Sequence, residues 1–152
     1  MTLAEFISVA GLIFGLSGFI LGILNYLRDR AHIEVTLQWD LTVTPGTEYD
    51  PAKPWGLITV TNAGRRSAYV SHVALRLPRK KFEDSHLVIM SGIAGKKLSE
   101  GDQSERYLVS QDGMEEYARH WRDIVAQVSD STGKVWKSKK LDRKAIPSWA
   151  KA

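Results

Sequence analysis

The sequence predicts a mainly β protein, with one membrane-spanning helix followed by an antiparallel β-sandwich that contains one short helix. Three observations support this fold class. Residues 6–27 form an apolar run without a charged side chain. Short stretches of alternating polar and apolar residues then follow at close spacing, separated by turn sequences, which is typical of sandwiches. No long helical patterns alternate with these stretches, which argues against a parallel α/β sheet.

The apolar run is long enough to cross a lipid bilayer. As a helix, residues 6–27 would extend ~33 Å, against a hydrocarbon core of ~30 Å. A cleaved signal peptide is not expected, because the run is too long and the residues before it carry Glu5 but no Lys or Arg. We therefore assign residues 1–30 to a single transmembrane helix and its flanks.

Small residues form a stripe along this helix. They recur at steps of four and three and are Ala4, Ser8, Gly11, Gly15, Gly18 and Gly22, with Asn25 at the next step. Helices in lipid associate where small residues let their backbones approach closely. The stripe predicts a homo-oligomer that forms through helix packing. A partner helix from another protein would satisfy it equally, and glycine is frequent in membrane helices in general.

The charges that flank the helix predict its orientation. Arg28 and Arg30 directly follow the apolar run, whereas the N-terminal flank has no basic side chain. The positive-inside rule then places the N-terminus outside and the C-terminal domain in the cytoplasm. We expect a single-pass protein of an inner (cytoplasmic) membrane, with membrane lipid and an unknown cytoplasmic protein as partners.

The pattern changes to strict alternation directly after the helix. Residues 32–43 alternate polar and apolar side chains, which predicts a half-buried strand. Its inward face is formed by Ile33, Val35, Leu37, Trp39, Leu41 and Val43. Because almost no linker separates helix and strand, the β domain must lie close to the bilayer.

Further strands are expected up to residue 139. They are predicted at 56–62, 68–77, 86–90, 96–98, 104–109, 123–129 and 134–139. In the strand 68–77, Tyr69 is expected to face inward together with Val73, Leu75 and Leu77.

A short helix is predicted late in the domain. Asp112, with Glu115 three residues later, resembles a capping box for a helix at 114–121. We expect the β-sandwich to occupy residues 31–145 and a C-terminal tail to occupy 146–152.

The sequence contains no recognisable catalytic or metal-binding motif. It has no cysteine, which excludes disulfides and thiolate metal sites. Its four histidines share no ligand-like spacing, and no nucleophile elbow, phosphate-binding loop or zinc-protease motif occurs. We expect a non-enzymatic protein without a metal or a cofactor.

Basic residues are the strongest remaining candidates for a binding surface on this chain, whose formal net charge is +4. The candidates for contact with anionic lipid or phosphate are Arg65, Arg66, Arg79, Lys80, Lys81, Lys137, Lys139, Lys140, Arg143 and Lys144. Three interpretations stay open: solvated charge that protects edge strands, attraction to lipid headgroups, and binding of a nucleotide or nucleic acid. The last is not favoured, because few aromatic residues lie among these basic residues. The main candidates for base stacking are Trp136 and Trp149.

The loop at 44–55 is a second candidate surface, since binding residues often lie in loops on a rigid scaffold. Tyr49 and Trp55 are its aromatic residues. Alternatively, Trp55 covers one end of the sandwich core.

Two segments carry a resemblance to known proteins. ITVTNAGRRSAYVSHVALRL at 58–77 and IVAQVSDSTGKVW at 124–136 resemble small bacterial and phage membrane proteins with one helix and an immunoglobulin- or fibronectin-like domain. This resemblance implies an immunoglobulin-like sandwich. The layout is also similar to membrane effectors of bacterial antiviral signalling, in which a cytoplasmic β domain senses a cyclic nucleotide.

Two main hypotheses for function follow. The first is a membrane-anchored binding module that self-associates through the helix and presents its sandwich to a cytoplasmic protein. The second is a ligand-gated, nucleotide-type effector that perturbs the membrane. A basic domain that binds anionic lipid headgroups is a further alternative.

Overall fold

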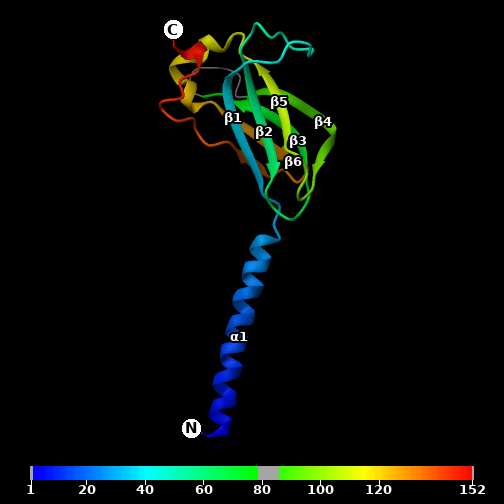
Figure 1. Ribbon diagram of the computed structural model, residues 1–152, viewed down its shortest axis with the longest axis vertical. Helices are drawn as coiled ribbons and strands as arrows, with labels where there is room; N and C mark the ends of the chain where they lie inside the picture. Colours follow the sequence, from blue (N-terminus) through cyan, green and yellow to red (C-terminus); the bar gives the residue numbers. More distant parts are fainter. Residues whose placement is uncertain (1, 79–85, 152) are drawn as a thin grey trace.

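The computed structural model describes residues 2–78 and 86–151, except for the side chains of residues 90–94. A single long helix extends from one end of a β-sandwich, and the two chain termini lie at opposite ends of the molecule (Figure 1). The fold is mainly β with antiparallel sheets, as the alternating sequence pattern predicts. Three of the candidate basic residues, Arg79, Lys80 and Lys81, lie outside the described residues.

The helix α1 spans Leu3–Arg28 and includes the whole apolar run. It begins with a capping box, in which the Thr2 hydroxyl accepts from the Glu5 amide and the Glu5 carboxylate accepts from the Thr2 amide. The hydroxyls of Ser8 and Ser17 donate to carbonyls one turn earlier, so their polar groups are satisfied within the helix. No residue of α1 is buried, and the helix is long and apolar enough to span a membrane.

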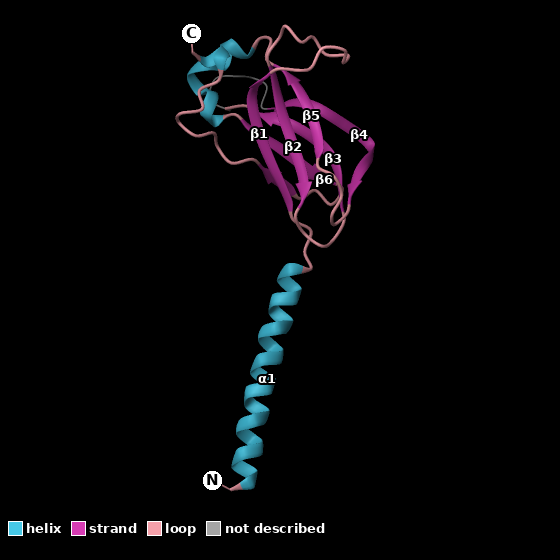
Figure 2. Ribbon diagram, in the orientation of Figure 1, coloured by secondary structure: helices cyan, strands magenta, loops and turns pink. Residues whose placement is uncertain are grey.

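Two sheets face each other in the domain that follows α1 (Figure 2). The first has the order β1-β2-β5, with β1 at Ile33–Leu41, β2 at Trp55–Asn62 and β5 at Glu105–Ser110. The second has the order β4-β3-β6-β7, with β4 at His86–Leu98, β3 at Ala68–Arg76, β6 at Val125–Asp130 and β7 at Val135–Lys137. Every neighbouring pair is antiparallel.

Alternating apolar side chains from both sheets fill the space between them. Ile33, Val35 and Leu37 of β1 are buried, as the alternation predicts. The expected inward residues of β2 and of the segment that includes β6 are also confirmed, and all are fully buried: Ile58, Val60, Ile124, Ala126 and Val128. This apolar interior is the main source of stability for a domain of this size.

The predicted inward face of β3 is wrong at Tyr69. Its side chain is 48% exposed, whereas Val70 and Val73 are both buried. The ladders on both sides of β3 shift register between Val70 and His72, so a bulge interrupts the strict alternation. Beyond the bulge, Val73, Leu75 and Leu77 are buried as expected.

The two short strands predicted at 86–90 and 96–98 form one continuous strand, β4. The glycine-containing stretch between them, where the sequence predicts a turn at 91–95, is part of the strand. Gly95 is required there for a different reason, because a Cβ at this position would lie 2.9 Å from the carbonyl oxygen of Val70. The missing side chain lets β4 stay close to the bulged part of β3.

The predicted capping box at Asp112 is also wrong. The segment Met114–Asp123 is a 3-10 helix, η1, and it is preceded by Gly113 with φ +81° and no side-chain cap. The Asp112 carboxylate instead binds the Lys53 ammonium at 2.8 Å. This ion pair ties the long loop before β2 to the start of η1.

The C-terminal residues pack back onto the sandwich. A second 3-10 helix, η2, covers Ser148–Ala150 and lies against η1. Trp149 belongs to the core and meets the Trp39 ring edge-to-face at 5.5 Å between centroids. The Ser148 amide donates to the Asp40 carboxylate at 2.8 Å. Because Trp149 is buried, it is not available for stacking on a nucleic-acid base.

Candidate functional site

The junction between α1 and β1 is short and fixed by backbone contacts. His32 precedes β1, and its carbonyl accepts a hydrogen bond from the Ala63 amide at 2.8 Å. Gly64 lies directly against the backbone of Arg30 and His32, where a Cβ atom would collide. The Arg66 guanidinium adds an ion pair to Asp29 at 3.2 Å. The turn after β2 therefore holds the start of β1 and the end of α1 together.

The small-residue stripe lies exposed along α1. Ala4, Ser8 and Asn25 are exposed, and a Cβ added at Gly11, Gly15, Gly18 or Gly22 would meet nothing within 4 Å. The described part of the β domain leaves this face of the helix uncovered. The stripe thus has room for a second helix, and self-association stays a prediction.

The candidate basic residues fall into two groups that lie on different parts of the domain. Arg65 and Arg66 lie in the turn after β2, beside the end of α1, where Arg65 is 4.0 Å from Glu100. Lys137 is the last residue of β7, Lys139 and Lys140 lie in the segment that follows it, and Arg143 and Lys144 come next as exposed residues. The sequence did not distinguish these two groups, because it does not reveal the order of strands in the sheets.

Lys137, Lys139 and Lys140 of the second group lie in one wall of a groove. The groove has a volume of about 650 Å³ and runs between β1 and the segment 136–142. Trp136, Lys137, Lys139 and Leu141 line one side, and residues 32–37 line the other. The groove lies on the side of the sandwich where β1 and β7, the edge strands of the two sheets, are next to each other.

The register of β1 shows which of its backbone groups face this groove. Since His32 and Ala63 are hydrogen-bonded partners, Glu34, Thr36 and Gln38 also direct their amides and carbonyls toward β2. The amides and carbonyls of Ile33, Val35 and Leu37 must then point to the outer edge. Among the described residues, no backbone hydrogen bond joins this edge to the segment 135–142. The outer edge of β1 is therefore unpaired.

The opposite side of the sandwich is closed in a different way. There the Lys96 ammonium of β4 contacts the Glu105 carboxylate of β5 at 2.8 Å, which links the two sheets. This hydrogen bond to Glu105 raises the pKa of Lys96. The contrast between the two sides singles out the β1 side as the accessible one.

Two contacts fasten the outer wall of the groove. Ser138 is buried, and it exchanges hydrogen bonds with Ala126 of β6 through its amide and hydroxyl. The Lys140 ammonium contacts Asp123 at 2.7 Å, and this hydrogen bond lowers the pKa of the Asp123 carboxyl. Lys137 and Lys139 make no ion pair within the part of the chain that the structure describes, so their charges remain available.

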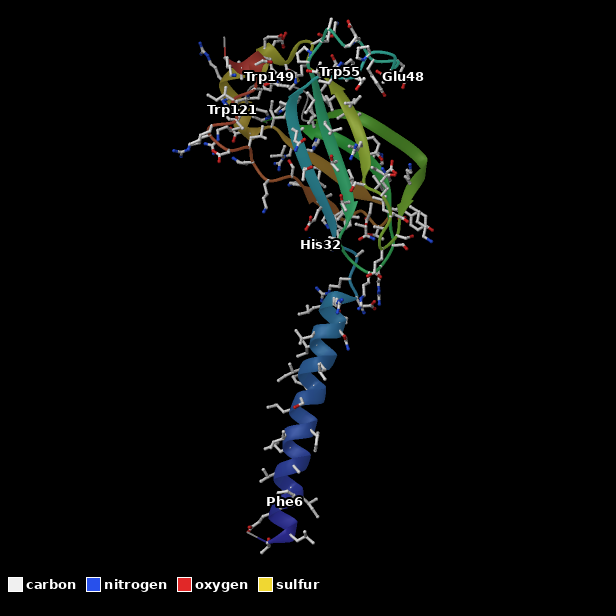
Figure 3. All side chains as sticks on the ribbon, viewed as in Figure 1. Phe6, His32, Glu48, Trp55, Trp121 and Trp149 are labelled. Carbon is white, nitrogen blue, oxygen red and sulfur yellow. The ribbon has the colours of Figure 1, made fainter. Side chains whose placement is uncertain are left out.

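The loop before β2 lies at the end of the domain that is far from α1, as the labelled Glu48 and Trp55 show in Figure 3. Tyr49 and Trp55 meet edge-to-face at 5.3 Å between ring centroids. The Trp55 indole donates to the Asp50 carbonyl at 2.9 Å. These contacts give the loop internal order, and both interpretations of its aromatic pair remain predictions.

The residues that sequence reasoning missed are backbone groups and distant charges. The open edge at Ile33, Val35 and Leu37 depends on strand order, and these residues are ordinary core residues in the sequence. Arg30 and Lys134 were likewise not among the predicted binding residues, although they line the same cavity as Arg66 at the junction. Across the described residues, no group of three or more His, Asp or Glu side chains is arranged to hold a metal ion.

The ion pair between Lys140 and Asp123 predicts a defined pH dependence. Because the folded-state pKa of Asp123 is lowered, the pair stabilises the wall above the ordinary pKa of 3.8, and this contribution disappears as pH falls through the lowered value. Lys140→Ala should raise the Asp123 pKa toward its ordinary value and cost less than about 1 kcal/mol at neutral pH, since both side chains are half-exposed. An NMR titration of the Asp123 carboxyl measures this shift. An unchanged pKa would contradict the contact, and Lys139→Ala is the matched control.

No protein-family model matches the chain, and no curated protein matches it at a significant level. The resemblance to small bacterial and phage membrane proteins therefore stays a prediction.

Proposed function

We propose that this protein is a non-enzymatic, membrane-anchored binding module that takes an extended segment of a protein partner as an added strand beside β1. The observation that carries this proposal is the unpaired outer edge at Ile33, Val35 and Leu37, next to a groove of about 650 Å³. Strand addition to an exposed sheet edge is a common mode of peptide recognition, in which backbone hydrogen bonds supply the affinity.

The walls of the groove favour a partner segment with acidic and apolar side chains. Lys137 and Lys139 offer uncompensated positive charge, and Trp136 and Leu141 offer half-buried apolar surface. The two acidic residues of the groove make contacts within the chain. Glu34 lies 3.9 Å from His32, and Asp142 accepts a hydrogen bond from the Lys144 amide. Charge complementarity of this kind steers association and discriminates between partners.

The helix α1 would supply the membrane anchor and a site of self-association. Its uncovered small-residue stripe fits close packing with a second copy of the same helix. Pairing through α1 would place two grooves on neighbouring domains, which increases the effective concentration for a bivalent partner. The short junction would transmit the orientation of the helix to the groove.

We place the β domain on the cytoplasmic side of an inner membrane, because Arg28 and Arg30 follow the apolar segment. A green fluorescent protein fused after Ala152 should be fluorescent, since it matures in the cytoplasm. A periplasmic phosphatase fused at the same position should be inactive. Phosphatase activity would contradict this orientation and the cytoplasmic partner together.

A proline substitution tests strand addition directly. Val35→Pro removes an outward amide without breaking a ladder hydrogen bond, because Pro is tolerated on an edge strand where the N–H faces away from the ladder. It also replaces a buried side chain, which the control below accounts for. A photo-crosslinking residue in place of Thr36, in the full chain in its membrane, should give a protein adduct that Val35→Pro abolishes. Val35→Ala is the matched control, because it reduces the side chain but keeps the amide.

The fold of both variants can be followed by tryptophan fluorescence, since all five tryptophans lie in the β domain. Crosslinking of the folded Val35→Pro variant at the level of the parent chain would refute strand addition. Loss of the adduct in both Val35→Pro and Val35→Ala would also argue against strand addition. Binding would then depend on the Val35 side chain and not on its outward amide.

A further inference from the structure

A second cavity lies at the junction between α1 and the sandwich. It has a volume of about 460 Å³, and three segments that are distant in the sequence build it. The linker after α1 contributes Arg30, the turn after β2 contributes Arg66 and Ser67, and the turn between β6 and β7 contributes Thr132 and Lys134. Three cationic residues and several hydroxyl-bearing residues thus line one space. The Lys134 ammonium also lies 4.9 Å from the centroid of the Trp136 ring, so its flexible side chain has a second contact beside the cavity.

The carboxylates near this cavity are already engaged. Asp130 Oδ1 accepts hydrogen bonds from the Thr132 amide at 2.9 Å, the Thr132 hydroxyl at 2.6 Å and the Lys134 amide at 2.8 Å. These bonds hold the turn between β6 and β7. Asp29 contacts one nitrogen of the Arg66 guanidinium, which has five N–H donors in total. The cavity therefore keeps an excess of positive charge and donors, as an anion requires.

Arg30 is held at the level where the helix ends. Its guanidinium lies over the Tyr26 ring at 4.7 Å from the centroid, next to the last turn of α1. If α1 spans a membrane, as the proposed function holds, the cavity lies at the depth of the lipid headgroups. Arginine pairs with phosphate oxygens through two parallel hydrogen bonds, which makes it the preferred side chain for such a ligand.

We infer that this junction cavity binds the phosphate group of an anionic lipid through Arg30, Arg66 and Lys134. This inference rests on the membrane span of the proposed function and not on the groove beside β1. The bound lipid would fix the orientation of the sandwich relative to the bilayer, because the three cations come from the linker and from both sheets. A free phosphate ion shares the same chemistry and is the alternative source of the ligand.

The test uses the full chain in nanodiscs of phosphatidylcholine with or without phosphatidylglycerol, followed by mass spectrometry of the lipids that remain bound after extraction. The parent chain should retain phosphatidylglycerol over phosphatidylcholine by about tenfold or more, given the attraction of basic residues to anionic headgroups. The double variant Arg66→Gln/Lys134→Gln should lose this preference. The matched control Arg65→Gln/Lys137→Gln removes the same net charge outside the cavity and should keep it.

An equal loss of preference in both double variants would overturn the inference, because diffuse attraction would then explain the binding. Inorganic phosphate would also overturn the lipid assignment if it binds to the chain in nanodiscs of phosphatidylcholine alone but displaces no phosphatidylglycerol from the chain in the mixed nanodiscs. Failure of the parent chain to enter nanodiscs would refute the membrane span itself. The Val35→Pro variant, which leaves this cavity intact, should keep the lipid preference whether or not the groove binds a partner.

Discussion

The hydrogen bond between the Ala63 amide and the His32 carbonyl determines much of this structure, because it sets the register of β1 against β2 at the point where the helix ends. In an antiparallel ladder, one hydrogen-bonded pair decides the direction of every other backbone group along the strand. Gly64 then packs on the backbone of Arg30 and His32, and Arg66 reaches Asp29. The open edge and the cationic cavity both follow from this one junction.

The two long sides of the sandwich differ in whether their edge strands are linked to each other. One side is linked by Lys96 and Glu105, whereas the other has an unpaired strand and a separate basic wall held by Ser138 and Lys140. Proteins usually protect exposed edges with bulges and lysines. Here Asp40, with φ +59°, ends the regular part of β1. Lysines lie across the groove from β1 but form no backbone hydrogen bonds with its outer edge. This arrangement limits the accessible edge to a short stretch, which suits a specific ligand segment.

Much of the fold was predictable because burial imposes a period of two on each strand. Ile33, Val35 and Leu37, together with Ile58 and Val60, follow this period without interruption. Tyr69 was misplaced because a bulge gives β3 one extra residue relative to β6, and a bulge leaves no mark in the alternation that precedes it. Asp112 was misassigned as a helix cap because its partner, Lys53, lies 59 positions away in the sequence. The sites were less predictable, since strand order alone brings Arg30, Arg66 and Lys134 together and leaves the outer edge of β1 unpaired.

Strand addition beside β1 depends most on the unpaired amides that Ile33, Val35 and Leu37 direct into the groove. Residue-resolved hydrogen exchange by NMR, on the full chain in detergent micelles, measures this directly. The account predicts alternation along β1, with fast exchange at these three amides and slow exchange at Glu34, Thr36 and Gln38, whose amides bond to β2. Uniform protection along β1 would contradict it, because the outer edge would then already be paired and could not accept a partner strand.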